Sequence, residues 1–152
     1  MSWSREGGLV ERELVEFPGK PIALALAPLD VVTGDELCVL GYEGQRDAAG
    51  VVRVLSRGSA GWRELGKAQA GPRSWSIRVA GDHVVASAQN GHHLGLWRSA
   101  TKDGRFMLTA LPELGVGTGP LGIALADVDG DGLLDIVCAN AFSDDVSILP
   151  GR

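Results

Sequence analysis

The sequence predicts an all-β fold, built of β-propeller-type four-stranded blades in three repeat units. Composition is the first observation, because the 152 residues include 22 glycines and 7 prolines. That glycine content is roughly double the usual share of about 7%. Glycine and proline interrupt the chain so often that long helices have little room, and short strands joined by tight turns remain. This pattern is typical of a sandwich, a barrel or a propeller.

An internal repeat is the second observation. Residues 20–27, 71–80 and 119–126 align on three prolines, Pro21, Pro72 and Pro120. Successive prolines are 51 and 48 residues apart. A period near fifty residues predicts a repeated supersecondary unit.

Each unit is expected to contain four strands, A to D. We predict strand A at 22–27, 74–80 and 121–126, strand B at 36–40, 83–88 and 134–139, strand C at 51–55, 93–98 and 145–149, and strand D at 62–68 and 105–111. A further D strand is predicted at 9–17, where a short amphipathic helix is the alternative. The chain is then one domain, 1–152, with units of about 20–69, 70–117 and 118–152, the last completed by 1–19.

The alternation of large and small apolar residues in the first A strand is the third observation. Ile22, Leu24 and Leu26 alternate with three alanines, so both faces of the strand are apolar and one is small. We expect this strand to be buried on both sides, as the inner strand of a blade is.

Three units are too few for a closed ring, because closed propellers have four to eight blades. Either the chain is part of a longer one, or two copies assemble into a six-bladed ring. Bare sheet faces and edges favour association. A homo-oligomer, a dimer that completes the ring, is therefore one expectation.

Charge and hydropathy exclude several classes of function. The net charge of −5 argues against a general nucleic-acid-binding surface. No stretch has the length and apolarity of a transmembrane helix, and the first fourteen residues, MSWSREGGLVEREL, lack the apolar core of a secretion signal. Cys38 and Cys138 lie in apolar runs, which favours buried free thiols over a disulfide.

The most specific chemistry lies in residues 127–135. Aspartates occupy positions 1, 3, 5 and 9 of this loop, with glycines at 4 and 6. Calcium takes six to eight oxygen ligands, and alternating carboxylates in a curled loop supply them. We therefore predict a Ca²⁺ site and weigh it against a plain acidic turn and against catalysis by paired carboxylates. An EF-hand is excluded, because Cys138 stands where its bidentate glutamate would be and the flanking sequences are β-rich.

Residues 117–140, followed by 145–149, closely resemble an FG-GAP/VCBS repeat, the blade of integrin-α-like β-propellers. The resemblance implies that the A–B loop binds Ca²⁺. Its ligands would be Asp127, Asp129, Asp131, the carbonyl of Leu133, and Asp135. Aligning Ala27 with Ala126 places Glu36 on Asp135 and leaves the first unit with an incomplete loop, so one metal site per chain is expected.

The resemblance also implies a non-enzymatic interaction module that recognises a protein or glycan ligand, in an extracellular or periplasmic setting. No catalytic constellation is visible in the sequence. The alternatives are a lectin-like, carbohydrate-binding propeller and the propeller domain of a polysaccharide-degrading enzyme. Blade packing is preferred over sugar stacking for the tryptophans, and turn or surface roles over metal binding for the histidines. The residues concerned are Trp3, Trp62, Trp75, Trp97, His83, His92 and His93.

Overall fold

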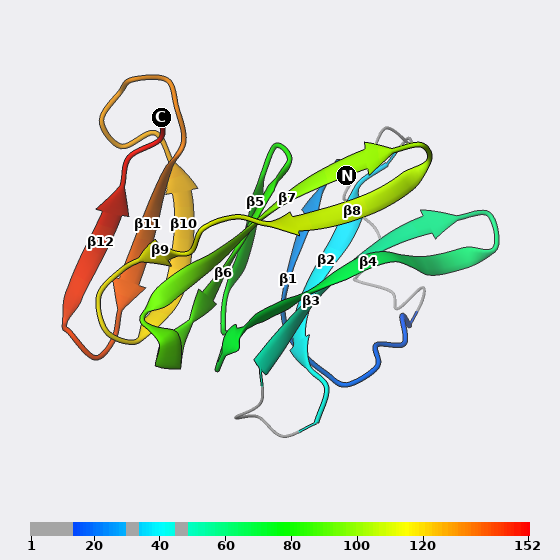
Figure 1. The fold of residues 1–152 in the computed structure, drawn as a ribbon, viewed down its shortest axis with the longest axis horizontal. Coiled ribbons are helices and arrows are strands. Elements are labelled where there is room, and N and C mark those ends of the chain that lie inside the picture. Colours follow the sequence, from blue (N-terminus) through cyan, green and yellow to red (C-terminus); the bar gives the residue numbers. More distant parts are fainter. Residues whose placement is uncertain (1–13, 30–33, 45–48) are drawn as a thin grey trace, which may run out of the picture.

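The computed structural model describes residues 14–29, 34–44 and 49–152, and its strands form three antiparallel sheets that lie side by side in chain order (Figure 1). The first sheet has the order β1-β2-β3-β4. Its strands are β1 (Lys20–Ala27), β2 (Glu36–Tyr42), β3 (Ala49–Gly58) and β4 (Gly61–Pro72). Each strand pairs with its neighbour in sequence, as expected for a blade built from successive hairpins.

The second and third sheets repeat this meander. The second contains β5 (Ile77–Ala80), β6 (His83–Ala88), β7 (His93–Lys102) and β8 (Arg105–Ala110), and the short β9 (Leu114–Gly115) pairs with β7. The third contains β10 (Pro120–Ala126), β11 (Asp135–Asn140) and β12 (Asp145–Leu149). The predicted all-β class is confirmed, and the sheets are consistent with propeller-like blades.

Helical structure in the described residues is limited to one short 3₁₀ turn, η1 (Gln89–Gly91). None of the described residues belongs to a helix with the length and apolarity needed to cross a membrane.

The first and third sheets share a distinctive start to their inner strands. The register between β1 and β2 shifts between Pro21 and Ala23, and that between β10 and β11 shifts between Pro120 and Gly122. Proline cannot donate to the ladder, so an irregularity beside it is expected. The common irregularity lies at the prolines on which the sequence repeat was aligned.

The second inner strand is shorter than predicted, because β5 begins at Ile77 and not at residue 74. The buried hydroxyl of Ser87 accepts hydrogen bonds from the backbone N–H groups of Trp75, at 3.2 Å, and Ser76, at 3.1 Å. Because a side chain, and not a neighbouring strand, accepts from these two N–H groups, residues 74–76 lie outside the ladder.

The sheets pack face to face through two apolar cores. The Tyr42 hydroxyl donates a hydrogen bond to the Ser74 carbonyl, at 2.8 Å, and so joins the first sheet to the segment that leads into the second. Buried members of the first core include Cys38, Leu40, Val52, Val54, Ile77, Val84 and Trp97, and those of the second are Val85, Leu94, Ile123 and Cys138. Both faces of the middle sheet are therefore covered.

The two faces of β1 have different surroundings. Ala23, Ala25 and Ala27 pack into the core shared with the second sheet. On the opposite face, Leu24 is 62% exposed and Leu26 is 52% exposed. The prediction that this strand is buried on both sides is therefore wrong for the leucine face, because no sheet of this chain stacks against it among the described residues.

The segment predicted as a strand at 9–17 is described only from residue 14, and residues 14–17 form no strand. The ring of Phe17 lies against Gly41, where a Cβ atom would come within 2.6 Å of the ring, and the Arg53 guanidinium lies 5.8 Å from the ring centroid. This end of the segment therefore packs on the first sheet. Residues 1–13 lie outside the described residues, so completion of the last unit by 1–19 stays a prediction.

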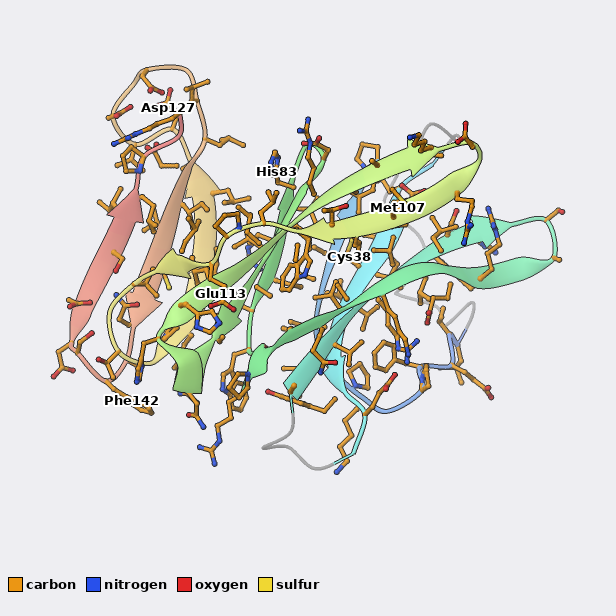
Figure 2. The ribbon with its side chains drawn as sticks, viewed as in Figure 1. Cys38, His83, Met107, Glu113, Asp127 and Phe142 are labelled. Carbon is orange, nitrogen blue, oxygen red and sulfur yellow. The ribbon has the colours of Figure 1, made fainter. Side chains whose placement is uncertain are left out.

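Both cysteines are free and fully buried, as predicted. Cys38 lies between the first and second sheets (Figure 2). Burial, reinforced by the nearby Glu36 carboxylate, raises the pKa of the Cys38 thiol to about 12. Burial also raises the pKa of Cys138.

We predict that neither thiol of the native protein reacts with a chromogenic disulfide reagent at pH 7 or at pH 9. Reaction needs an accessible thiolate, and both groups are buried, with pKa values raised by that burial. In guanidinium chloride both thiols should react promptly. Rapid modification of one thiol per native chain would contradict the packing of that cysteine.

Candidate metal centre

The acidic loop lies at one end of the third sheet, between β10 and β11 (Figure 2). Ala126 pairs with Asp135 as the last rung of this hairpin, so residues 127–134 form the loop. Asp127 follows β10 directly, and Asp135 is the first residue of β11. The strand ladder therefore brings the first and last carboxylates of the motif to the base of the same loop.

Two glycines let the loop curl. Gly130 has φ +83° and Gly132 has φ +88°, in the left-handed region that favours glycine. The N–H of Gly130 donates to Oδ1 of Asp127 at 2.7 Å, and the N–H of Gly132 donates to Oδ2 of the same carboxylate at 2.9 Å. Asp127 thus folds the loop around its own side chain.

The middle aspartates bind neighbouring backbone in the same way. Oδ1 of Asp129 accepts from the N–H of Asp131 at 3.1 Å, and Oδ1 of Asp131 accepts from the N–H of Leu133 at 2.8 Å. Such turns, in which an aspartate accepts from the residue two positions on, hold a loop without regular secondary structure. The carboxylates are therefore positioned by the loop's own hydrogen bonds.

Asp135 differs from the others because it is buried, with 1% of its surface exposed. Its Oδ1 accepts from the N–H of Gly151 and its Oδ2 from the N–H of Val128, both at 2.8 Å. These hydrogen bonds, that from Gly151 first, lower the pKa of the Asp135 carboxyl. The group is thus held ionised at neutral pH, which a cation ligand requires.

Three of the predicted carboxylates come together. Asp127, Asp129 and Asp135 each place one oxygen within 4.8 Å of the others. Oxygens on opposite sides of a calcium ion at about 2.3–2.6 Å each are separated by at most about 5 Å. The spacing and the hard oxygen donors of this group fit a calcium ion.

Two predicted ligands are not part of this group. Asp131 is absent from the cluster found among the described residues. Coordination by Asp131 and by the carbonyl of Leu133 stays a prediction. Sequence reasoning missed the hydrogen bond from Gly151, because that residue lies 16 positions from Asp135 and nothing in the motif indicates it.

The first sheet carries a counterpart of Asp135. Glu36 pairs with Ala27 as Asp135 pairs with Ala126, which matches the alignment of the repeats. Oε2 of Glu36 accepts from the N–H of Leu29 at 2.7 Å, two residues after Ala27, as Asp135 does from Val128. The base of this loop is preserved, while residues 30–33 lie outside the described residues.

The histidines make separate contacts. His83 pairs with Asp82 at 2.8 Å, His93 contacts Glu113 at 3.2 Å, and His92 lies in a left-handed conformation at φ +54°. No histidine belongs to a potential metal-binding group within the part of the chain that the structure describes. The preference for turn and surface roles over metal binding stays a prediction.

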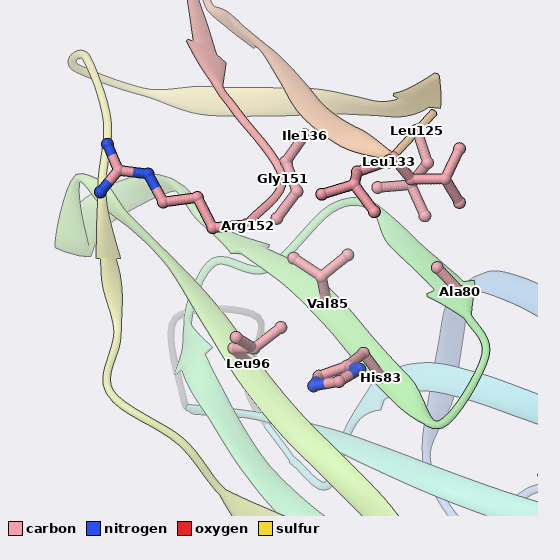
Figure 3. A pocket seen from close by; sticks show the side chains of 10 residues that line it. Ala80, His83, Val85, Leu96, Leu125, Leu133, Ile136, Gly151 and Arg152 are labelled. Atoms are coloured by element: carbon pink, nitrogen blue, oxygen red, sulfur yellow. The ribbon is translucent and has the colours of Figure 1, made fainter. Parts of the chain in front are cut away.

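A cavity of about 360 Å³ lies beside the acidic loop, between the second and third sheets (Figure 3). Its walls are mostly apolar, with contributions from Val85 and Leu96 on one side and Leu125 and Ile136 on the other. Leu133 and Leu134 of the loop also line it. The conformation of the loop therefore shapes one wall of the cavity.

Residues 81–138 match the family model described as an FG-GAP-like repeat. This match confirms the predicted resemblance where the two overlap, and it runs from the β5–β6 turn into β11 and includes the whole acidic loop. No curated protein matches the chain closely enough to be counted a relative.

We predict that Asp135→Asn lowers the thermal unfolding midpoint of the protein even in excess chelator. The variant replaces a buried acceptor of two backbone hydrogen bonds with a group that has one acceptor oxygen. Loss of such a buried bond costs about 1–3 kcal/mol. Asp131→Asn is the matched control, because its acceptor is exposed, and differential scanning calorimetry should show little change for it in chelator. Equal midpoints for the two variants would contradict the structural role of Asp135.

Proposed function

We propose that the chain is a calcium-stabilised FG-GAP-like propeller module that acts as a non-enzymatic interaction platform. Its units would be about 20–69, 70–117 and 118–152, the last completed by 1–19. The observation that supports calcium binding best is the cluster of Asp127, Asp129 and Asp135 oxygens within 4.8 Å. FG-GAP repeats are typically non-catalytic modules, which supports an interaction role.

The electrostatics of the loop explain why an ion would stabilise it. Two carboxylates about 4 Å apart repel by roughly 4 kcal/mol at an effective dielectric constant of 20. A bound calcium ion supplies the positive charge that offsets this repulsion. Asp127 and Asp135 belong to opposite ends of the loop, so the ion would tie β10 to β11. Through Asp135 it would also secure the backbone at Gly151.

The tryptophans of the described residues give little support to a glycan partner. Sugar stacking needs open aromatic faces, yet Trp97 is buried in the first core and Trp75 is half-buried, with Nε1 donating to Oε1 of Gln89 at 3.1 Å. Trp62 is half-buried on β4, and Trp3 lies outside the described residues. A glycan array probed with and without chelator tests this preference. Calcium-dependent binding to a defined glycan would reverse it in favour of a lectin-like module.

The calcium proposal predicts a chelator-sensitive melting temperature. Binding to the folded state alone stabilises it by about 2.7 kcal/mol at a hundredfold excess over Kd. The wild-type protein should therefore melt several degrees higher in calcium than in EDTA, as measured by differential scanning fluorimetry. Asp129→Ala and Asp131→Ala should melt lower in calcium and lose the response to EDTA.

The matched control for this experiment is Asp103→Ala, which removes an exposed carboxylate from the β7–β8 turn. It should keep the full response to EDTA. Isothermal titration should give one calcium ion per wild-type chain. A wild-type melting curve unchanged by EDTA, with no heat of binding, would overturn the calcium site.

A further inference from the structure

The second and third sheets close against each other at one end and separate toward the acidic loop. Away from the loop, Leu94 of β7 and Ile123 of β10 are buried between them, with 0% and 3% of their surface exposed. Nearer the loop, Leu96 and Leu125, which lie two residues further along the same strands, are only half-buried. The cavity of about 360 Å³ occupies this opening (Figure 3).

The walls of the cavity are apolar on both sides. Leu96 pairs with Val85 across β6 and β7, and Leu125 pairs with Ile136 across β10 and β11, so each sheet contributes one rung of large side chains. Water in such a space finds few hydrogen-bond partners, and an apolar group that displaces poorly ordered water gains affinity. Ligand pockets have volumes of about 300–1,000 Å³, so this cavity is at the small end and suits a single ring system.

The side chain of His83 gives one end of the cavity a hydrogen-bonding group (Figure 3). His83 and Val85 lie two residues apart on β6, so both point to the same face of the sheet. Nδ1 of His83 lies 2.8 Å from Oδ1 of Asp82, and because a carboxylate can only accept, Nδ1 carries the proton. In the neutral imidazole, Nε2 is then the hydrogen-bond acceptor.

A second contact fixes the Asp82 carboxylate. Nε of Arg98 donates to Oδ2 of Asp82 at 2.6 Å, and Arg98 pairs with His83 across β6 and β7. This hydrogen bond lowers the pKa of the Asp82 carboxyl, so the group is ionised at neutral pH. Two neighbours on the same sheet therefore set the orientation and the tautomer of the imidazole, and a preorganised group binds a ligand at lower entropic cost.

The acidic loop forms a further part of the wall. Leu133 and Leu134, which precede the buried Asp135, both line the cavity. Gly151 also lines it, and its N–H donates to Oδ1 of Asp135. A change of the loop around an ion therefore changes the shape of the cavity directly, without a long chain of contacts between two sites.

We propose that the cavity receives a tyrosine or tryptophan side chain of a protein partner and that calcium strengthens this binding. The inference rests on the proposed function and names what the module recognises. An aromatic ring fills the space between the apolar walls, while its O–H or N–H donates to Nε2 of His83. Phenylalanine lacks this donor, and the guanidinium of Arg152 extends away from the walls, so the occupant needs no charge (Figure 3). Tyrosine and tryptophan are also enriched among the anchors of protein interfaces.

Two small probes that differ in one hydrogen-bond donor test the site. N-acetyl-tryptophanamide should bind the calcium-loaded protein and shift the backbone amide signals of His83, Val85 and Leu133 in NMR titrations. Its analogue methylated on the indole nitrogen keeps the ring and loses the donor, so it should bind about three- to tenfold more weakly. Equal dissociation constants for the two probes, or no shift at these three residues, would overturn the proposal.

Three variants separate this site from non-specific binding. Ala80→Trp places a ring in the cavity from the end of β5 and should abolish binding of both probes. His83→Phe removes the acceptor, so both probes should bind it equally. Ala100→Trp is the matched control, because Ala100 is an exposed residue of β7 outside the cavity lining, and it should bind the tryptophan probe as the wild type does.

Each variant should keep the strand-rich circular dichroism spectrum of the wild type. Undiminished binding by Ala80→Trp would contradict the location of the site. Continued discrimination between the two probes by His83→Phe would contradict the role of the imidazole.

The same titrations in EDTA separate this inference from the calcium proposal. The dissociation constant of the tryptophan probe should rise at least about fivefold in EDTA, and because coupling is reciprocal, the probe should tighten calcium binding by the same factor. A protein that melts higher in calcium but binds the probe equally in EDTA would refute the coupling and leave the metal site standing. A probe bound in the cavity of a protein whose melting ignores EDTA would refute the metal site and the coupling, and leave the aromatic pocket standing.

Discussion

The structure depends on the face-to-face packing of small sheets through their inner strands. Sheets of three or four strands have too little core of their own, and they become stable only when one apolar face is covered. In this chain the middle sheet is covered on both faces, by the first sheet and by the third. Alanine alternates with leucine or isoleucine on β1, and the alanine row leaves space for Ile77 and Val79 of β5.

The packing of the third sheet on the second also positions the candidate metal centre. Strands β10 and β11 are held by Ile123 and Cys138 against the second sheet, and their last rung positions Asp127 and Asp135. The loop between them then folds on its own side chains, with two glycines at positive φ. A rigid sheet therefore supports a loop whose four carboxylates would otherwise repel one another.

The first sheet keeps the base of the loop but not the full set of carboxylates. Glu36 keeps the buried acceptor at the base of its loop and bonds the backbone of Leu29. Pro28 and Val32 stand where the third unit has Asp127 and Asp131. The first unit therefore keeps the carboxylate that bonds the loop to the strand. It lacks two of the carboxylates that would face an ion in the third unit.

Local sequence determined most of the strands and the acidic loop. Period-two alternation, turn glycines and regularly spaced aspartates act over a few residues, so the strand at 145–149 and the cluster of Asp127, Asp129 and Asp135 could be predicted without a structure. Contacts between residues distant in sequence were decided by the tertiary structure. Ser87 shortens β5, Phe17 packs on Gly41, and Gly151 supports Asp135, and no local pattern carries these pairings. The exposure of Leu24 was also decided there, because burial of a strand face depends on which sheet stacks against it and not on the strand itself.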